Sequence, residues 1–256
     1  MTKRFDLSGE VAVITGGGRG IGLACAEALG EAGAQLVLIE PQIDAARAGV
    51  DALKDKGIEA QAIEGDVTDS TRMTAIADQL AEEGRAATIL VNNAGIGEAG
   101  TSVEDTTDAQ WLRMMDVNLN GLFWCTRAFG RHMVQARRGS IVNLGSMSGL
   151  IANRPQPQTP YNVSKAAVHH LTRSLAAEWG QHNVRVNAVA PTYIETPMVL
   201  ANPLNQDRIP LWLADTPLGR MGQAEEVANA VLFLASGGAS LVTGAVLPVD
   251  GGYTCW

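Results

Sequence analysis

Cysteine is scarce in this chain of 256 residues, which contains three: Cys25, Cys125 and Cys255. None belongs to a CxxC pair or has a histidine at metal-ligand spacing, so neither a structural zinc site nor a disulfide framework is expected. Long apolar runs are also missing. No stretch of about 18 apolar residues occurs, and the N-terminal MTKRFDLSGE has no apolar signal core. We therefore expect a cytoplasmic protein without a bound metal or a membrane partner.

Positive charge is in deficit as well. The chain has 19 Lys and Arg against 27 Asp and Glu, with a formal net charge of −8. Nucleic acids and anionic membranes are bound by basic surfaces, so neither is an expected partner and a small molecule is favoured. The 46% hydrophobic content suffices for one sizeable core, and we expect a single catalytic domain over residues 1–256.

Short apolar, β-branched segments alternate with helical patterns along the chain. Strands are expected at 11–15, 35–40, 59–66, 87–92, 140–146, 184–191 and 245–250. Such alternation predicts an α/β fold, a Rossmann-like, doubly wound parallel sheet of about seven strands flanked by helices. Residues 192–218 break the pattern with four prolines. A segment of this length is typical of a lid or substrate loop, and a plain surface loop is the alternative.

The first strand is followed by the glycine-rich turn GGGRGIG, with glycines at positions 16, 20 and 22. Glycines at a strand-to-helix turn let main-chain N–H groups approach a diphosphate, which the helix N-terminus also attracts. The spacing is GxxxGxG and not the strict GxGxxG, so a purely structural turn is the alternative.

An acidic residue decides which dinucleotide this turn favours. Glu40 ends the second strand, 18 residues after Gly22. A carboxylate there accepts hydrogen bonds from ribose hydroxyls and repels a 2′-phosphate, which favours NAD over NADP. Arg19, inside the turn, argues the other way because its charge attracts that phosphate. We give Glu40 more weight because it would lie against the ribose itself.

The stretch PYNVSKAAVHHL (160–171) has a tyrosine and a lysine one helical turn apart. Pro160 suits the first turn of a helix, and Tyr161 and Lys165 then share one face. A nearby ammonium stabilises a phenolate, so we expect the pKa of Tyr161 to be lowered. An amphipathic helix with a surface lysine is the alternative for this motif alone.

Many of the distinctive polar and glycine residues follow strand ends, the edge where open α/β sheets bind ligands. With TGGGRGIG (15–22), DVTD (66–69), NNAG (92–95), VNLNG (117–121), IVNLGS (141–146), YNVSK (161–165) and VDGG (249–252), the chain resembles the classical short-chain dehydrogenase/reductase family. The resemblance runs over essentially the whole chain.

The resemblance implies a role for each matching residue. Tyr161 would be the catalytic acid/base, and Lys165 would tune it and bind the nicotinamide ribose. Ser146 would hydrogen-bond the reacting oxygen, and Asn118 would hold a water that links Lys165 to solvent. The implied cofactor contacts are Gly16, Arg19, Gly20, Ile21, Gly22, Glu40, Asp66, Val67, Asn93, Gly95, Tyr161, Lys165, Ile194 and Thr196, with Asp66 and Val67 at the adenine.

Three positions depart from the family pattern. The serine usually stands thirteen residues before the tyrosine, where Ser148 lies, yet Ser146 ends the strand and is our choice for the catalytic serine. Thr192 replaces the glycine that commonly follows Pro191, which puts the local backbone in doubt if φ must be positive. His169 and His170 lack ligand partners at metal spacing, so we expect packing or surface histidines.

Within the family, the chain resembles polyol dehydrogenases of the galactitol type through NLGSMSGLIANRPQ (143–156), AVHHLTRSLAAEW (167–179), WLADTPLGRMG (212–222) and VDGGYTCW (249–256). This implies an NAD-dependent interconversion of a polyol and a ketose by a homotetramer, with Trp256 near a subunit interface. Ser148, Asn153 and Gln158, with Gln156, would contact substrate, as a site for hydroxyls requires, or would face solvent. Apolar residues of the lid segment would close over the substrate or form a subunit contact: Met198, Leu204, Leu211, Trp212 and Leu213.

Two other functions are open at this point. One is an NADPH-dependent reductase of the ketoacyl type, favoured by Arg19 and opposed by Glu40. The other is a Rossmann protein that senses nucleotides without turnover, opposed by the complete set of Ser146, Tyr161, Lys165 and Asn118. Some relatives hold a divalent cation at their C-terminal carboxylates, and this sequence gives no independent sign of one.

Overall fold

A seven-stranded parallel sheet forms the centre of the computed structural model, which describes residues 3–201 and 203–256. The strands are β1 (Val11–Thr15), β2 (Gln35–Glu40), β3 (Ala60–Glu64), β4 (Ile89–Asn92), β5 (Gly139–Leu144), β6 (Val184–Pro191) and β7 (Val246–Val249). Their order is β3-β2-β1-β4-β5-β6-β7, and every neighbouring pair is parallel. The predicted doubly wound sheet is confirmed, and only the ends of some strands differ from the expected ranges.

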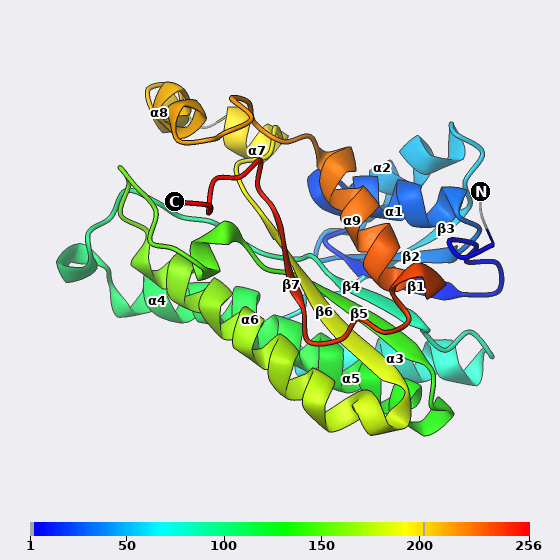
Figure 1. The fold of residues 1–256 in the computed structure, drawn as a ribbon. Coiled ribbons are helices and arrows are strands. Elements are labelled where there is room, and N and C mark those ends of the chain that lie inside the picture. The colour runs from blue at the N-terminus through cyan, green and yellow to red at the C-terminus, as the bar shows by residue number, and fades with distance from the viewer. Residues whose placement is uncertain (1–2, 202) are drawn as a thin grey trace.

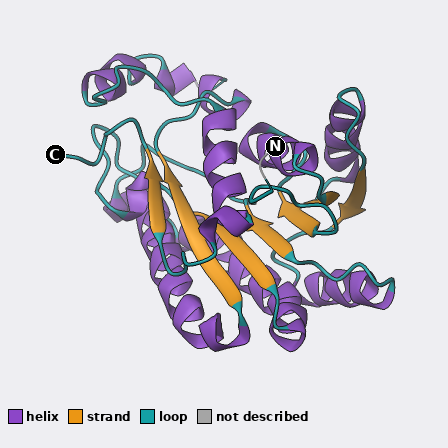
Figure 2. Cartoon of the chain, turned by 45° about the vertical axis from the view of Figure 1, so that its right-hand side comes forward, coloured by secondary structure: helices purple, strands orange, loops and turns teal. Residues whose placement is uncertain are grey.

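Helices cover both faces of this sheet (Figures 1 and 2). The longer ones are α1 (Gly20–Glu31), α2 (Ile43–Lys54), α3 (Ser70–Glu82), α4 (Asp108–Met115), α5 (Leu122–Ala136), α6 (Thr159–Trp179), α8 (Ile209–Ala214) and α9 (Ala224–Ala235). The short helix α7 (Pro197–Leu200) lies between β6 and α8. Apolar side chains of α1, α2 and α9 pack in one core cluster, and those of α3, α5 and α6 pack in another.

The strand sequences explain the two clusters. In β1, Ala12 and Ile14 belong to the cluster of α1 and α9, whereas Val11 and Val13 belong to the cluster of α3 and α5. Side chains alternate between the faces of a strand, so a strand buried on both faces reads as one continuous apolar run. Burial of each such side chain contributes on the order of 2 kcal/mol to stability.

The reversal of strand order lies between β1 and β4, which are hydrogen-bonded neighbours although two strands separate them along the chain. Loops that leave the carboxyl ends of these strands diverge to opposite sides of the sheet and open a crevice there. The glycine turn after β1 and the NNAG segment after β4 both begin at this point.

The segment 192–218 follows β6 and carries α7 and α8, so the predicted break in the alternating pattern is a loop with two short helices. Ile194 forms an isolated parallel bridge with Gly222, which fixes the two ends of the segment side by side. The side chains of Pro197 and Met198 lie outside the described part of the chain, and the contact expected of Met198 lies there with them. In the described chain, no helix is long and apolar enough to cross a bilayer.

Candidate active site

The glycine turn after β1 has the backbone that its sequence predicts. Gly16 and Gly20 have φ of +64° and +56°, which a side chain makes costly. Gly22 is a glycine for another reason, because a Cβ there would lie 2.1 Å from the carbonyl oxygen of Gly16. The helix α1 begins at Gly20, so its free N–H groups face the crevice beside the turn. Ile21 packs against the core below it.

Asn93, expected along the cofactor, braces this turn. Its side-chain Nδ2 donates to the carbonyl oxygens of Thr15 at 3.0 Å and Gly16 at 2.7 Å. The Thr15 hydroxyl in turn accepts from the main-chain N–H groups of Asn93 and Ala94, both at 3.1 Å. These bonds tie the ends of β1 and β4 together, so the crevice has a rigid floor.

Glu40 lies at the end of β2 with 8% of its surface exposed. Its Oε1 accepts the main-chain N–H of Gly18 at 2.9 Å, inside the glycine turn. Arg19, the next residue, is exposed. The acidic side chain is therefore fixed beside the turn, whereas the basic one points into solvent.

The two residues expected at the adenine lie in different surroundings. Asp66 is exposed, and its Oδ1 accepts from the main-chain N–H and the hydroxyl of Thr68 at 2.9 and 2.8 Å. Val67 is buried against Gly121, where an added Cβ would lie 2.7 Å from its Cγ2. The side chain of Val67 thus packs inward, and only its main chain remains to face a ligand.

The strand β5 and the helix α6 bring together the residues expected to do chemistry. Tyr161 lies in the first turn of α6. Pro160, the residue before it, suits this turn because proline has no main-chain N–H that would need a partner. Ser146, just beyond the end of β5, acts on the Tyr161 hydroxyl as a hydrogen-bond partner that lowers the pKa of Tyr161. Lys165 Nζ lies 5.6 Å from the Tyr161 ring centroid and donates to the carbonyl oxygen of Leu144 at 2.8 Å. The three side chains therefore meet at one sheet edge.

The electrostatics of this group differ from the sequence prediction. Burial raises the pKa of Tyr161, and the hydrogen bond from Ser146 acts in the opposite direction. Burial also lowers the pKa of Lys165 to about 8, since the residue is 5% exposed and its ammonium is bonded to a carbonyl, not a carboxylate. The expected lowering of the Tyr161 pKa is therefore wrong for the chain by itself, because desolvation outweighs the hydrogen bond from Ser146.

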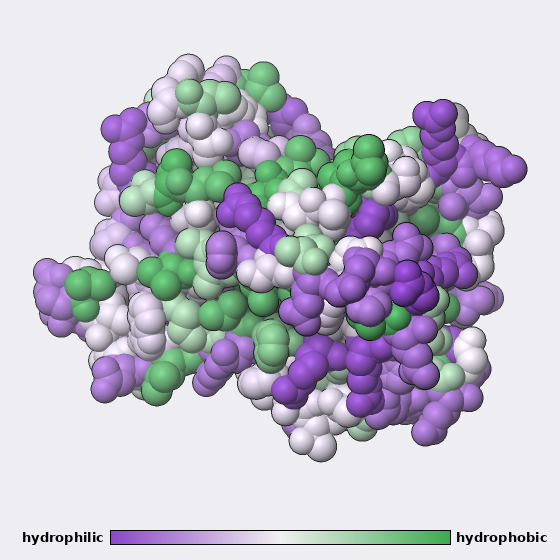
Figure 3. Space-filling model, turned by 60° about the horizontal axis from the view of Figure 1, so that its bottom comes forward, coloured by the Kyte–Doolittle hydropathy of each residue, from purple (hydrophilic) through white to green (hydrophobic). Residues whose placement is uncertain are grey.

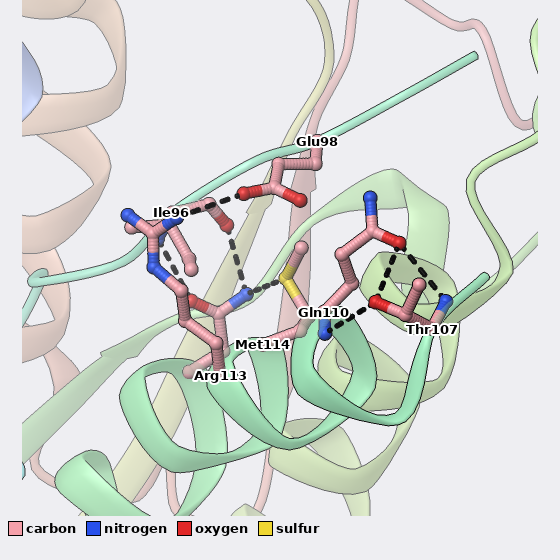
Figure 4. A network of polar contacts seen from close by, with 7 residues as sticks. Ile96, Glu98, Thr107, Gln110, Arg113 and Met114 are labelled. Carbon is pink, nitrogen blue, oxygen red and sulfur yellow. Dashed lines mark hydrogen bonds and ion pairs between the residues drawn. The ribbon is translucent and has the colours of Figure 1, made fainter. Parts of the chain in front are cut away.

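Asn118 is buried in a π-helical turn, Asp116–Gly121, between α4 and α5. Its Oδ1 accepts the main-chain N–H of Ile96 at 2.8 Å, and its Nδ2 donates to the Ile96 carbonyl at 2.9 Å. The same Nδ2 lies 3.1 Å from Met114 Sδ, and Figure 4 shows Ile96 and Met114 on this side of the turn. The side chain is thus committed to the loop after β4. π turns are frequent at functional sites because they free main-chain groups.

Gly95 lies where this loop passes the reactive group. A Cβ at Gly95 would stand 3.3 Å from Asn118 Oδ1 and 3.7 Å from Lys165 Nζ. Further along the loop, Glu98 pairs with Arg113 of α4 at 3.2 Å (Figure 4). The loop 95–98 is therefore held by the π turn through Ile96 and by α4 through Glu98 while it borders the ammonium.

Ser146 is the serine that acts on the pKa of Tyr161, which supports the choice made from the strand end. Ser148 is buried, and its hydroxyl accepts from Gln158 Nε2 at 3.2 Å. Gln158 also donates to Asn162 at 3.1 Å. Two of the expected substrate residues, Ser148 and Gln158, thus lie next to each other and close to the reactive group.

Asn153, the third expected substrate residue, joins an aromatic cluster that the sequence analysis did not single out. Its Nδ2 donates to the Tyr193 hydroxyl at 3.1 Å, as does Gln156 Nε2 at 2.9 Å. The Tyr193 ring stacks on Trp212 of α8 at 3.7 Å between centroids, and Trp212 Nε1 donates to Gln156 at 3.2 Å. Gln156 Nε2 also lies 3.5 Å from Gln158 Oε1, so Gln156 links this cluster to the Ser148–Gln158 group. The position of Tyr193 two residues beyond β6, at the ligand edge, was the available signal.

The segment 192–218 reaches both halves of the crevice. Thr196 lies beside Gly20, since a Cβ on that glycine would be 3.7 Å from the threonine Cγ2. Ile194 is buried and packs in the core. Thr192, which replaces the usual glycine, does not need a special backbone: in the described chain the non-glycine residues with positive φ are Arg137 and Asn183. The doubt raised by this substitution is resolved.

Two further predictions concern histidines and metals. His169 is buried and His170 is exposed. Among residues 3–201 and 203–256, no group of three or more His, Cys, Asp or Glu is arranged to hold a metal ion.

A parallel Rossmann-like sheet with a glycine turn at its switch point, and a Ser-Tyr-Lys group at the end of the next strand β5, defines a nucleotide-dependent oxidoreductase. A family model described as "Enoyl-(Acyl carrier protein) reductase" matches residues 16–254. The chain belongs to the short-chain dehydrogenase/reductase family, whose members bind a nicotinamide cofactor, and it acts on an alcohol.

Similar proteins cover the chain almost end to end. A galactitol 2-dehydrogenase of Rhizobium johnstonii is 68% identical, covering 99% of this chain and 98% of its own. A galactitol 2-dehydrogenase (L-tagatose-forming) of Cereibacter sphaeroides is 50% identical, covering 98% of each. Among solved structures, the crystal structure of gox2181 superposes with a TM-score of 0.96 at 46% identity, covering 98% of both chains.

Proposed function

We propose that this protein is an NAD-dependent polyol dehydrogenase that interconverts a secondary alcohol of a hexitol such as galactitol, or a related sugar alcohol, and the corresponding ketose. The observation that carries the proposal is the hydrogen-bonded Ser146–Tyr161 pair with Lys165 beside it at the sheet's ligand edge. The identity of 68% to a galactitol 2-dehydrogenase supports the substrate class.

The residues at the crevice fit a dinucleotide. Gly16 and Gly20 provide a turn without side chains, and α1 directs its free N–H groups toward the same place, as a diphosphate requires. Glu40 presents a fixed carboxylate that suits ribose hydroxyls and opposes a 2′-phosphate. When bound, NAD supplies the nicotinamide that accepts a hydride from the carbinol carbon.

The remaining chemistry belongs to the chain. Ser146 donates a hydrogen bond to the substrate oxygen, and Tyr161, as the phenolate, accepts the hydroxyl proton. Protonated Lys165 stabilises the phenolate, because a positive charge in a buried site favours the ionised partner. Its pKa of about 8 keeps Lys165 mostly protonated at neutral pH. In ketose reduction the same residues act in the reverse direction, and Tyr161 donates the proton to the substrate oxygen.

Asn118 takes part through its main chain. Because its side-chain amide is bound to Ile96, a water that connects Lys165 with solvent would be held by the main-chain carbonyl of Asn118. This refines the role expected from the sequence and keeps Asn118 as the residue that shapes the proton path.

Substrate hydroxyls would be recognised by Ser148 and Gln158, which lie beside Ser146, and by Asn153, which is bonded to Tyr193. Asn153 Oδ1 is buried and has no hydrogen-bond partner in the described chain, so it can accept from a substrate hydroxyl. A site that hydrogen-bonds hydroxyls rejects analogues without them more strongly than an apolar pocket does. The segment 192–218 would close over the substrate as a lid.

Assembly into a homotetramer in the cytoplasm is part of the proposal. Apolar side chains are exposed on α4 (Trp111, Leu112), α6 (Val163) and at the C-terminal Trp256. Figure 3 shows apolar surface gathered toward the left of the face that it presents, while the right is mostly polar. Exposed apolar patches of this kind are typical of subunit contacts.

Initial rates with NAD and NADP, each against hexitols, pentitols, small diols and simple secondary alcohols, test the function, with reverse assays on ketoses and a ketoacyl thioester. NAD-dependent hexitol oxidation is expected, with L-tagatose as the product from galactitol. NADPH-dependent ketoacyl reduction without polyol activity would overturn the proposal and favour the ketoacyl reductase, which the exposed Arg19 supports. Tyr161→Phe separates an enzyme from a nucleotide sensor: it should abolish turnover and leave NAD binding intact.

A further inference from the structure

His169 lies one helical turn after Lys165 on α6, buried to 2% exposure, and is not used in the chemistry above. Its Nε2 lies 3.4 Å from the main-chain nitrogen of Ser146. A main-chain N–H is always a donor, so Nε2 has to be the acceptor and the ring proton has to reside on Nδ1. The imidazole is therefore neutral and directed at the main chain of the catalytic serine.

The loop that carries Ser146 is shaped around this ring. A Cβ on Gly145 would lie 2.3 Å from His169 Nε2, and a Cβ on Gly149 would lie 2.6 Å from its Cε1. Gly145, ahead of the 3-10 turn Met147–Gly149, and Gly149, at its end, thus have to be glycine for the ring to fit. Within the turn, the Ser146 hydroxyl accepts the N–H of Ser148 at 3.1 Å.

The charges around His169 favour this neutral state. Burial lowers the pKa of His169 to about 4, and the nearby cations of Lys165 and Arg173 act in the same direction. At the pH where a dehydrogenase works, the acceptor at Nε2 is therefore always available.

We infer that His169 is a positioning residue: its neutral Nε2 holds the main-chain N–H of Ser146 and so aims the serine hydroxyl at Tyr161. This inference rests on the proposed function, because it assigns the residue to the same reaction. Loss of the acceptor should let the serine loop turn away from Tyr161. Tyr161 would then lose the hydrogen bond that opposes the rise of its pKa.

A purely space-filling role is the alternative, and the choice of variant separates the two. His169→Leu keeps an apolar side chain in the cavity and removes the acceptor. His169→Gln restores an acceptor at about the same distance from the backbone. His170→Leu is the matched control, because it makes the same change at the neighbouring, exposed position.

The first readout is a titration of Tyr161 that requires no substrate. The absorbance of phenolate is followed against pH for each variant, and the same titration in a Tyr161→Phe background is subtracted. The apparent pKa of Tyr161 should rise in His169→Leu, return in His169→Gln and stay unchanged in His170→Leu. NAD binding and thermal unfolding, measured alongside, identify any variant that fails to fold.

The second readout is the steady-state rate with the polyol that the wild type oxidises. We expect His169→Leu to lower kcat about ten-fold with KM nearly unchanged, which is the effect of one lost hydrogen bond. A higher pKa of the base Tyr161 should also move the acidic limb of the pH–rate profile for oxidation to higher pH. Equal Tyr161 titrations and equal kcat in the folded Leu and Gln variants would overturn the inference. If the wild type oxidises no polyol and His169→Leu still raises the apparent pKa of Tyr161, the proposed substrate is wrong and the positioning role of His169 is retained.

Discussion

The main-chain N–H of Gly18 donates a hydrogen bond to Oε1 of Glu40 at 2.9 Å. The bond joins the glycine turn after β1 to the end of β2, so the two features expected to choose the dinucleotide are one structural unit. A Cβ on Gly18 would stand 3.1 Å from the same Oε1 and 2.4 Å from the carbonyl oxygen of Ala45. Glycine is therefore required there for the carboxylate to reach the turn.

Glu40→Gln tests whether the charge of this carboxylate selects NAD. The amide oxygen can still accept from Gly18, so the turn is kept while the repulsion of a 2′-phosphate is removed. We expect the ratio of kcat/KM for NAD to that for NADP to fall at least about ten-fold, measured by initial rates with one alcohol. Arg19→Gln is the companion variant and should weaken NADP use. An unchanged ratio in Glu40→Gln would show that the charge does not discriminate.

Paired alanine variants distinguish the two serines after β5. Ser146→Ala removes the hydroxyl that contacts Tyr161, and kcat should fall by about 100-fold or more, as for loss of a donor to the reacting oxygen. Ser148→Ala removes an acceptor for Gln158, so the effect should be mainly on KM. Comparison of kcat and KM for the two proteins is the measurement. A larger loss of kcat in Ser148→Ala would reverse the assignment.

The sheet could be predicted from the sequence because each strand is buried on both faces. The run VAVIT sends Ala12 and Ile14 to one core and Val11 and Val13 to the other, and the same alternation holds in QLVLIE. A continuous apolar run of this length, bounded by glycine or polar residues, has few alternatives in an α/β protein. The ends of the strands were harder to predict, because hydrogen bonding of the last residues depends on where the neighbouring strand ends.

The site was predictable where chemistry is tied to local spacing and less so where it depends on distant contacts. The helical spacing of Tyr161 and Lys165 is a local property, and the structure keeps both at one place. The bonds from Asn118 to Ile96 and from Asn153 to Tyr193 join segments that are 22 and 40 residues apart. No periodicity encodes such pairs. The prediction that the pKa of Tyr161 is lowered was wrong for the same reason, because the burial of this side chain is set by the whole fold.

Trp212 connects the lid helix α8 to the substrate side of the site. It is 3% exposed, stacks on Tyr193 and donates to Gln156, whereas its neighbour Leu211 is 51% exposed. Trp212→Ala should loosen residues 203–216, with faster proteolysis of this segment and a several-fold higher KM for the polyol. Loss of this buried ring should also lower the free energy of unfolding by about 3 kcal/mol.

Leu211→Ala is the matched control on the same helix and should change neither proteolysis nor KM. Hydrogen exchange of the segment with and without substrate adds a direct comparison of its stability. If Trp212→Ala and Leu211→Ala behave alike, the stack does not hold the lid against the site.

The buried ammonium of Lys165 should reduce the stability of the fold at neutral pH. Its pKa of about 8 in the folded chain lies below the ordinary value of 10.5, because burial disfavours the charge. Below pH 8, Lys165 is protonated in both the folded and the unfolded chain, so the free-energy cost of the buried charge is present in full. Between about pH 8 and 10.5 the unfolded chain binds more protons than the folded one, so the contribution of Lys165 to stability rises with pH.

Lys165→Met removes the charge and keeps most of the side-chain volume. The pKa difference corresponds to about 3 kcal/mol, and loss of the bond to the Leu144 carbonyl offsets about 1 kcal/mol. We therefore expect the inactive variant to be about 2 kcal/mol more stable than the wild type at pH 7, with a smaller difference at pH 10. Urea unfolding at both pH values, at one protein concentration, measures this. Lys54→Met, at the exposed end of α2, should show no such pH-dependent gain. A Lys165→Met protein that is less stable than the wild type at pH 7 would mean that the bond to Leu144 outweighs the desolvation of the ammonium.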